Sequence, residues 1–243
     1  MIFTLFKKEF HSLITAPSTW GMLALLQFIF GWFFLARMND YLQIQAQLAQ
    51  MDAAPGATIA IAAPLASVLA LVLMMLIPLF TMRLIAEERR NKTWTLLATA
   101  PISATHIVLG KFLGLLAALT LIIAACALMM SALSLGTHAD FGLILSNILG
   151  VWLLATSYAA LGTYFSALTH QPVVAAFGAL AVSFGLWMLE MSSDAVRTLS
   201  PNTHFQNLNV GLVSTADLGY FVLFIAGFLL LAIRRIYDER GGE

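Results

Sequence analysis

The chain has 243 residues, of which 60% are hydrophobic and only 10% are charged, and its formal net charge is zero. A soluble domain averages about 45–50% apolar and about 25% charged residues, so the composition excludes an ordinary water-soluble protein and indicates an integral membrane protein. The single cysteine, Cys126, excludes an intramolecular disulfide. Zero net charge carries no information about nucleic acid, and we expect no such partner.

An amphipathic helix is expected over residues 1–16, lying in the inner membrane interface. Apolar residues recur there at helical spacing with polar residues between them: Phe3, Phe6, Phe10, Leu13 and Ile14, against Lys7, Lys8, Glu9 and Ser12. A frayed tail is the alternative. No small-x-small cleavage pattern follows the first long apolar stretch, so we expect an uncleaved span and not a signal peptide.

Six stretches are long and apolar enough to cross the hydrocarbon core, which takes about 20 residues. They are Trp20–Ala36, Ile59–Met82, Phe112–Leu135, Phe141–Leu168, Val173–Leu189 and Leu218–Ile233. The fourth and fifth form one run without charges, which THQP at Thr169–Pro172 divides because Pro disfavours helical geometry in the residue before it. The expected fold is therefore an all-α membrane protein with six transmembrane helices in a single domain, residues 1–243.

The orientation follows from the distribution of Lys and Arg, which are enriched on the cytoplasmic side. With a cytoplasmic N-terminus, only Arg37 and Arg197 of the 12 basic residues fall outside. The other ten fall inside: Lys7, Lys8, Arg83, Arg89, Arg90, Lys92, Lys111, Arg234, Arg235 and Arg240. Both termini are therefore predicted to be cytoplasmic.

The segment 83–106 between the second and third spans holds the densest charges, in the sequence EERRNKTWTLLATAPISATHIVLGK from Glu87. We expect Glu87, Glu88, Arg89 and Arg90 to prolong the second helix until Asn91-Lys92 breaks it. Trp94, Leu97 and Ala98 then share one face of a short helix that ends before Pro101, and Ser103 or Thr105 caps the next helix. Such a helix is shaped to receive force from a cytoplasmic partner. The alternative is that Trp94 merely sits among the lipid headgroups.

The outer segment 191–217 also carries signals of order. Ser200-Pro201 is a cap residue followed by Pro at the first helical position, and Gly211 is a plausible stop, so a short helix is expected at Pro201–Val210. An unstructured loop is the alternative there. Ser214 and Asp217 resemble a capping box that opens the sixth span.

Catalytic, cofactor-binding and metal-binding residues are not expected in this chain. The spans lack ionisable residues at mid-depth, where such residues usually mark function, and the five histidines are scattered. The pair Gly110-Lys111 lacks the earlier Gly and the Ser/Thr of a phosphate-binding loop. We therefore expect no enzyme activity and no ATP binding by the chain itself.

The stretch from Glu87 to Lys111, with Thr93 and Trp94 in it, resembles the signature between the second and third spans of ABC-2 type permeases. A second likeness, to the permeases of gliding motility and of copper processing (nitrous-oxide-reductase maturation), covers the outer segment with Ser200, Pro201, His204, Phe205 and Gly211. The N-terminal FKKEF is similar to the interfacial helix of the family.

The resemblance implies a permease subunit in a bacterial inner membrane, facing a second copy or a paralogue, with ATP and Mg²⁺ bound by a separate ATP-binding subunit. It implies that Glu87, Glu88, Arg89 and Arg90 form a cytoplasmic gate and the stem of a coupling helix. Trp94, Leu97 and Pro101 would shape the docking surface. The subunit would serve an exporter or flippase. The alternative is a membrane-embedded scaffold or mechanotransmission subunit that transports nothing.

Overall fold

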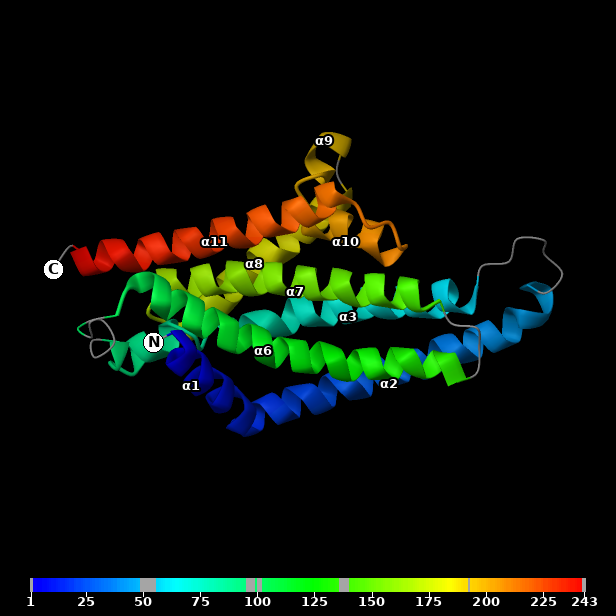
Figure 1. Ribbon diagram of the computed structural model, residues 1–243, viewed down its shortest axis with the longest axis horizontal. Helices are drawn as coiled ribbons and strands as arrows, with labels where there is room; N and C mark the ends of the chain where they lie inside the picture. Colours follow the sequence, from blue (N-terminus) through cyan, green and yellow to red (C-terminus); the bar gives the residue numbers. More distant parts are fainter. Residues whose placement is uncertain are drawn as a thin grey trace.

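The computed structural model describes residues 2–48, 56–94, 99, 102–135, 140–191 and 193–241, and within these ranges every regular element is helical. Figure 1 shows long helices running along one bundle axis. Six described helices are long and apolar enough to span a membrane: α2 (Pro17–Leu48), α3 (Ala57–Thr81), α6 (Ala104–Ser131), α7 (Phe141–Leu168), α8 (Pro172–Met188) and α11 (Thr215–Gly241). This confirms the predicted six-span, all-helical fold.

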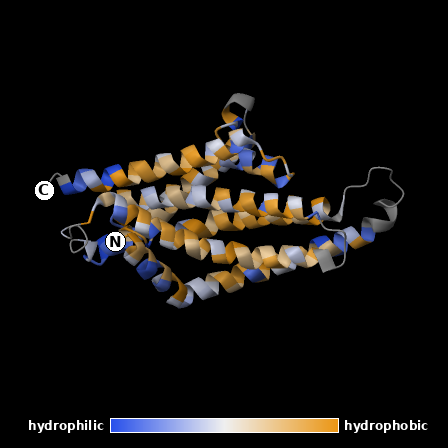
Figure 2. Cartoon of the chain, in the orientation of Figure 1, coloured by the Kyte–Doolittle hydropathy of each residue, from blue (hydrophilic) through white to orange (hydrophobic). Residues whose placement is uncertain are grey.

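Both chain termini lie at the same end of the bundle, which we call the terminal end (Figure 1). Hydrophobic residues line the middle of the long helices, and hydrophilic residues gather towards the ends (Figure 2). This distribution matches a lipid core between two polar interfaces.

Helix α7 is the centre of the bundle and packs against α3, α6, α8 and α11. In its most hydrophobic window 78% of the residues are buried, whereas the other five spans reach 22–50%. Close packing depends on small residues. A Cβ atom on Gly162 would lie within 2.8 Å of the Cβ of Thr81, so only glycine lets the end of α3 approach α7 this closely.

Some helices extend beyond the predicted spans. Helix α6 begins at Ala104, and Ser103, one of the two expected caps, accepts a hydrogen bond from the His106 N–H at 3.3 Å through its hydroxyl. Helix α2 continues past Ala36 to Leu48, since no Gly or Pro interrupts it. The predicted break at THQP is confirmed: α7 ends at Leu168, and Pro172 is the first residue of α8.

The N-terminal helix α1 (Ile2–Thr15) confirms the predicted helix and packs along α6. Its buried stripe is centred on Leu5 and Leu13, whereas Phe3, expected on the apolar face, is 73% exposed. Two glycines of α6 allow the contact: a Cβ atom on Gly110 would lie 2.7 Å from the Leu5 Cβ, and one on Gly114 would lie 2.7 Å from the Glu9 Cβ. The interfacial position of α1 stays a prediction.

Shorter elements complete the described part of the fold: α4 (Ala86–Arg90), the 3₁₀ turns η1 (Ala132–Leu135) and η2 (Leu189–Met191), α9 (Asp194–Arg197) and α10 (Pro201–Asn209). Helix α10 confirms the short helix predicted at Pro201–Val210. It lies against α7, where the ring of Phe205 fills the space left open by Gly150.

Candidate coupling site

The chain turns sharply between α3 and α4. The prediction that Glu87–Arg90 prolong the second helix is wrong, because α3 ends at Thr81 and residues 82–85 form turns before α4 begins. The interruption leaves backbone N–H groups without helical partners. Those of Ile85 and Ala86 donate to the Ser166 hydroxyl of α7 at 3.1 and 3.0 Å. The start of α4 is thus held by α7.

Helix α4 ends where the sequence predicts a break. Asn91 caps it, and Lys92 has a φ of +59°, the left-handed conformation that a regular helix cannot include. The chain folds back on α4, because the Thr93 N–H donates to the Glu88 carbonyl at 3.0 Å and the Thr93 hydroxyl donates to the same oxygen at 3.2 Å.

Arg89 is the buried charge of α4. Its side chain is 1% exposed, and Nη2 donates to Oε2 of Glu239 on α11 at 2.6 Å. Nε and Nη1 have no hydrogen-bond partner in the described part of the chain. The carboxylate of Glu239 also lies 3.5 Å from Nη2 of the more exposed Arg235. Arg89 therefore fastens α4 to the last helix through one short ion pair.

Glu88 belongs to a second buried cluster, centred on Lys111 of α6. The Lys111 side chain is 1% exposed, and Nζ donates to Oε1 of Glu9 at 2.5 Å and to Oε1 of Glu88 at 2.8 Å. Lys8 approaches the same Glu88 oxygen at 3.7 Å from the exposed surface of α1. A buried lysine is stable only when it is paired, so this cluster ties α1, α4 and α6 together.

Glu87 and Arg90 do not join these clusters. Glu87 is half-buried and Arg90 is exposed, so of the four residues grouped by sequence only Glu88 and Arg89 form the ion pairs described above.

Trp94 is half-buried and packs against the core, with the Arg89 guanidinium carbon 5.2 Å from the ring centroid. It is therefore not the freely exposed anchor expected from the sequence. Leu97, Pro101 and the short helix predicted around them lie outside the described residues. Beyond that segment, the Ile102 carbonyl accepts a hydrogen bond from Arg240 at the end of α11.

The outer segment has a polar centre around His204. Its Nδ1 lies 2.5 Å from Oδ1 of Asp217 and its Nε2 lies 2.9 Å from the Thr198 carbonyl, while its ring stacks on Tyr220 with centroids 4.0 Å apart. Both ring nitrogens therefore lie within hydrogen-bond distance of an oxygen atom, which fixes the orientation of the ring. The predicted capping box is wrong: Asp217 turns to His204, and Ser214 accepts from the Ala216 N–H at 3.2 Å.

The remaining outer residues act locally. The Ser200 hydroxyl caps α10 by accepting from the Asn202 N–H at 3.3 Å, with Pro201 as the first helical residue. Gly211 has a φ of +88°, a conformation natural to glycine, and it ends the helix as predicted. Phe205 is fully buried.

Sequence reasoning missed Glu9, Lys111 and Glu239 as partners of the charged stretch. A signal was present for Lys111, a single cation at the start of an otherwise apolar span, which requires a carboxylate nearby. No pattern in the sequence selects Glu239. Among the described residues, no group of three or more His, Cys, Asp or Glu side chains is placed to hold a metal ion.

In a comparison with known families, residues 3–240 match the model of a family described as ABC-2 family transporter protein. The matched range includes residues of every element described above. No curated protein matches the chain.

Proposed function

Because the chain belongs to the ABC-2 family of transporter proteins, and is thus a permease subunit of an ABC transporter, we propose that it serves an exporter or flippase driven by a separate ATP-binding subunit. That subunit would bind ATP and Mg²⁺ and dock at the terminal end, against the segment that begins with α4. From the sequence likeness of segment 191–217, we further propose kinship with the permeases of gliding motility and copper processing.

The observation that carries this proposal is the connection of α4 to the rest of the bundle. Two residues of the five-residue helix α4 are linked by ion pairs to three other helices: Glu88 through Lys111 to α6 and to Glu9 of α1, and Arg89 through Glu239 to α11. A force applied to this segment would reach α1, α6 and α11 together. An exposed membrane-edge loop would require no such buried connections, since charges can remain in water.

The proposed cycle follows from this connection. Two copies, or this chain and a paralogue, face each other in a bacterial inner membrane with both termini in the cytoplasm. ATP closes the paired ATP-binding subunits, the segments around α4 move together, and the spans rearrange to expel or flip the substrate. The residues of this chain would transmit the movement from the ATP-binding subunits to the spans, and ATP hydrolysis would take place in those subunits.

Docking would use the surface side of the segment. Arg90 and Thr93 are exposed, and the predicted surface continues to Leu97 and Pro101. Trp94 is half-buried beside Thr93, with its ring in contact with Arg89. Arginine and tryptophan are the residues whose truncation most often costs about 2 kcal/mol or more at protein interfaces.

The first observation to make is whether the neighbouring gene encodes an ATPase with a phosphate-binding loop. If so, that subunit is coexpressed with the tagged chain and the retained ATPase is measured after solubilisation. Arg90→Glu and Trp94→Ala should each reduce retention more than tenfold, since about 1.4 kcal/mol corresponds to one decade in affinity. Lys7→Glu, which reverses an exposed charge on α1 at the same end, is the matched control.

Two outcomes would contradict the proposal. Full retention of the ATPase by both variants would show that the charged stretch does not dock the ATPase and only lies at the edge of the membrane. A complex that hydrolyses ATP but moves no lipid or solute across proteoliposomes would favour the scaffold, an alternative that the family match does not favour.

A further inference from the structure

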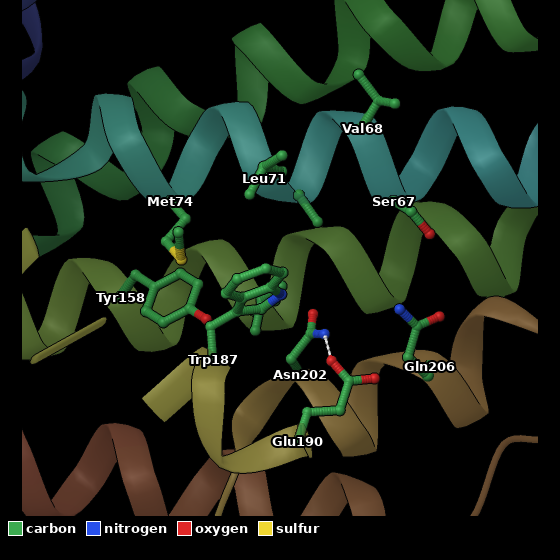
Figure 3. A pocket seen from close by; sticks show the side chains of 11 residues that line it. Ser67, Val68, Leu71, Met74, Tyr158, Trp187, Glu190, Asn202 and Gln206 are labelled. Atoms are coloured by element: carbon green, nitrogen blue, oxygen red, sulfur yellow. Dashed lines mark hydrogen bonds between the residues drawn. The ribbon is translucent and has the colours of Figure 1, made fainter. Parts of the chain in front are cut away.

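A cavity of about 280 Å³ lies away from the coupling site, beside the middle of α3 and towards α10. Figure 3 shows side chains from four elements converging on it: Tyr158 of α7, Trp187 of α8, Glu190 of η2 and Asn202 of α10. The fold has no evident structural need for an aromatic pair and a carboxylate at one hollow between spans.

The floor of the cavity holds a polar group without a partner. Tyr158 is 2% exposed, and its hydroxyl makes no hydrogen bond within the described part of the chain. Buried hydroxyls are nearly always paired, and buried tyrosines usually find a partner for the O–H group. The oxygen borders the cavity (Figure 3), so a molecule within the cavity could supply the missing bond.

The cavity also holds a negative charge that no basic residue balances. Asn202 Nδ2 donates to Oε2 of Glu190, and no lysine, arginine or histidine in the described residues forms an ion pair with this carboxylate. The other linings are mainly apolar, including Met74 and Leu154. A carboxylate in such surroundings favours a cationic ligand, because the attraction is less screened there than in water.

The aromatic residues indicate which kind of cation fits. The faces of Trp and Tyr attract quaternary and protonated amines, with Trp the strongest of the aromatic residues. A hard metal ion would need about six oxygen ligands, whereas this cavity offers one carboxylate with a few amide and hydroxyl groups. The combination of Glu190, Trp187 and Tyr158 therefore suits an organic cation with an apolar surface.

Size and access limit the ligand further. A volume of about 280 Å³ is just below the usual range for ligand pockets, about 300 to 1,000 Å³, so only a small ligand would fit. Glu190 and Gln206 at the rim are partly exposed, while Tyr158 and Met74 are buried. We propose that this cavity binds a small organic cation bearing a quaternary or protonated amine, either a free molecule or the headgroup of a lipid.

The test uses radiolabelled choline and the full chain in nanodiscs of phosphatidylglycerol, which carries no amine. Wild type should bind choline saturably. Glu190→Gln, which removes the charge but keeps the shape, and Trp187→Leu should each raise the Kd at least tenfold. The matched control is Asp40→Asn, which neutralises an exposed acid of α2 that does not line the cavity and should leave the Kd unchanged.

A neutral analogue of the same shape, 3,3-dimethylbutan-1-ol, isolates the role of charge and should not displace choline. Adding phosphatidylcholine to the nanodiscs separates the two sources. Competition with choline would identify a lipid headgroup as a ligand, and an unchanged Kd would identify a free amine.

Three results would overturn the inference: no choline binding by wild type, equal displacement by the neutral analogue, or an unchanged Kd in Glu190→Gln. Binding is measured without any ATP-binding subunit. Failure here would therefore leave the proposed coupling function intact, and failure of ATPase docking would leave this site intact.

Discussion

Nη2 of Arg89 lies 2.6 Å from Oε2 of Glu239, although 150 positions separate the two residues in the chain. The arginine is almost fully buried and the glutamate side chain is one-quarter exposed. This contact joins the short helix after the second span to the end of the last span, so it closes the charged segment against the bundle.

Glu239→Ala should destabilise the chain by about 3 kcal/mol, because removing one partner of a buried ion pair leaves the other charge uncompensated. The double variant Arg89→Met/Glu239→Ala should recover most of the loss, since it removes both charges. Thermal unfolding of the solubilised protein, analysed as a double-mutant cycle, measures both effects.

Asp238→Ala is the control for that cycle. Asp238 pairs with Arg234 at 4.0 Å with both side chains mostly exposed, and such pairs contribute about 0–1 kcal/mol. If Glu239→Ala lowered the stability no more than Asp238→Ala, the contact between Glu239 and Arg89 would not contribute to the stability of the fold.

Gly114→Ala should loosen α1 from α6. The added Cβ atom would lie 2.7 Å from the Glu9 Cβ and 3.2 Å from backbone atoms of Phe6 and Phe10, which cannot yield without moving the helix. Overpacking of this kind costs about 1–3 kcal/mol, and each kcal/mol lowers the melting temperature by about 2–4 °C in a chain of this size. Gly227→Ala, where nothing lies within 4 Å, should leave the melting temperature unchanged or raise it. Equal behaviour of the two variants would refute the close α1–α6 contact.

Topology can be tested with single cysteines, because the native Cys126 is buried and should give little background. A membrane-impermeant maleimide added from outside should label Leu212→Cys, in the exposed turn after α10, and spare Asn91→Cys. The reason is the distribution of basic residues, which predicts that the terminal end lies in the cytoplasm. If Asn91→Cys were labelled from outside and Leu212→Cys were not, the predicted orientation would be reversed. The segment around α4 would then face away from any cytoplasmic ATP-binding subunit.

Local signals made the helical framework predictable. The limits of α7 agree with the predicted fourth span at both ends, Phe141 and Leu168, because a Pro-containing break follows one end and Asp140 caps the other. Helix α10 was equally predictable from the sequence, since Ser200, Pro201 and Gly211 each act within their own turn. Where neighbouring residues decide the structure, the sequence is sufficient.

The candidate site was less predictable because its contacts are long-range. Lys111 meets Glu9 across 102 positions and Glu88 across 23, and no local pattern specifies such pairs. The break between α3 and α4 likewise depends on the Ser166 hydroxyl, which receives the released N–H groups. Trp94 was expected at the surface, but the guanidinium of Arg89 lies over its ring. That contact could not be predicted from the local sequence, because Arg89 is held by the distant Glu239.

The positions of these charges in the chain also set an order of assembly. Glu9 and Glu88 both precede Lys111, so this cluster can close as soon as the third span has left the ribosome. Arg89 differs, because its carboxylate is supplied by α11, which is synthesised 150 positions after α4. A nascent chain halted before α11 would hold an uncompensated cation where the finished protein buries one.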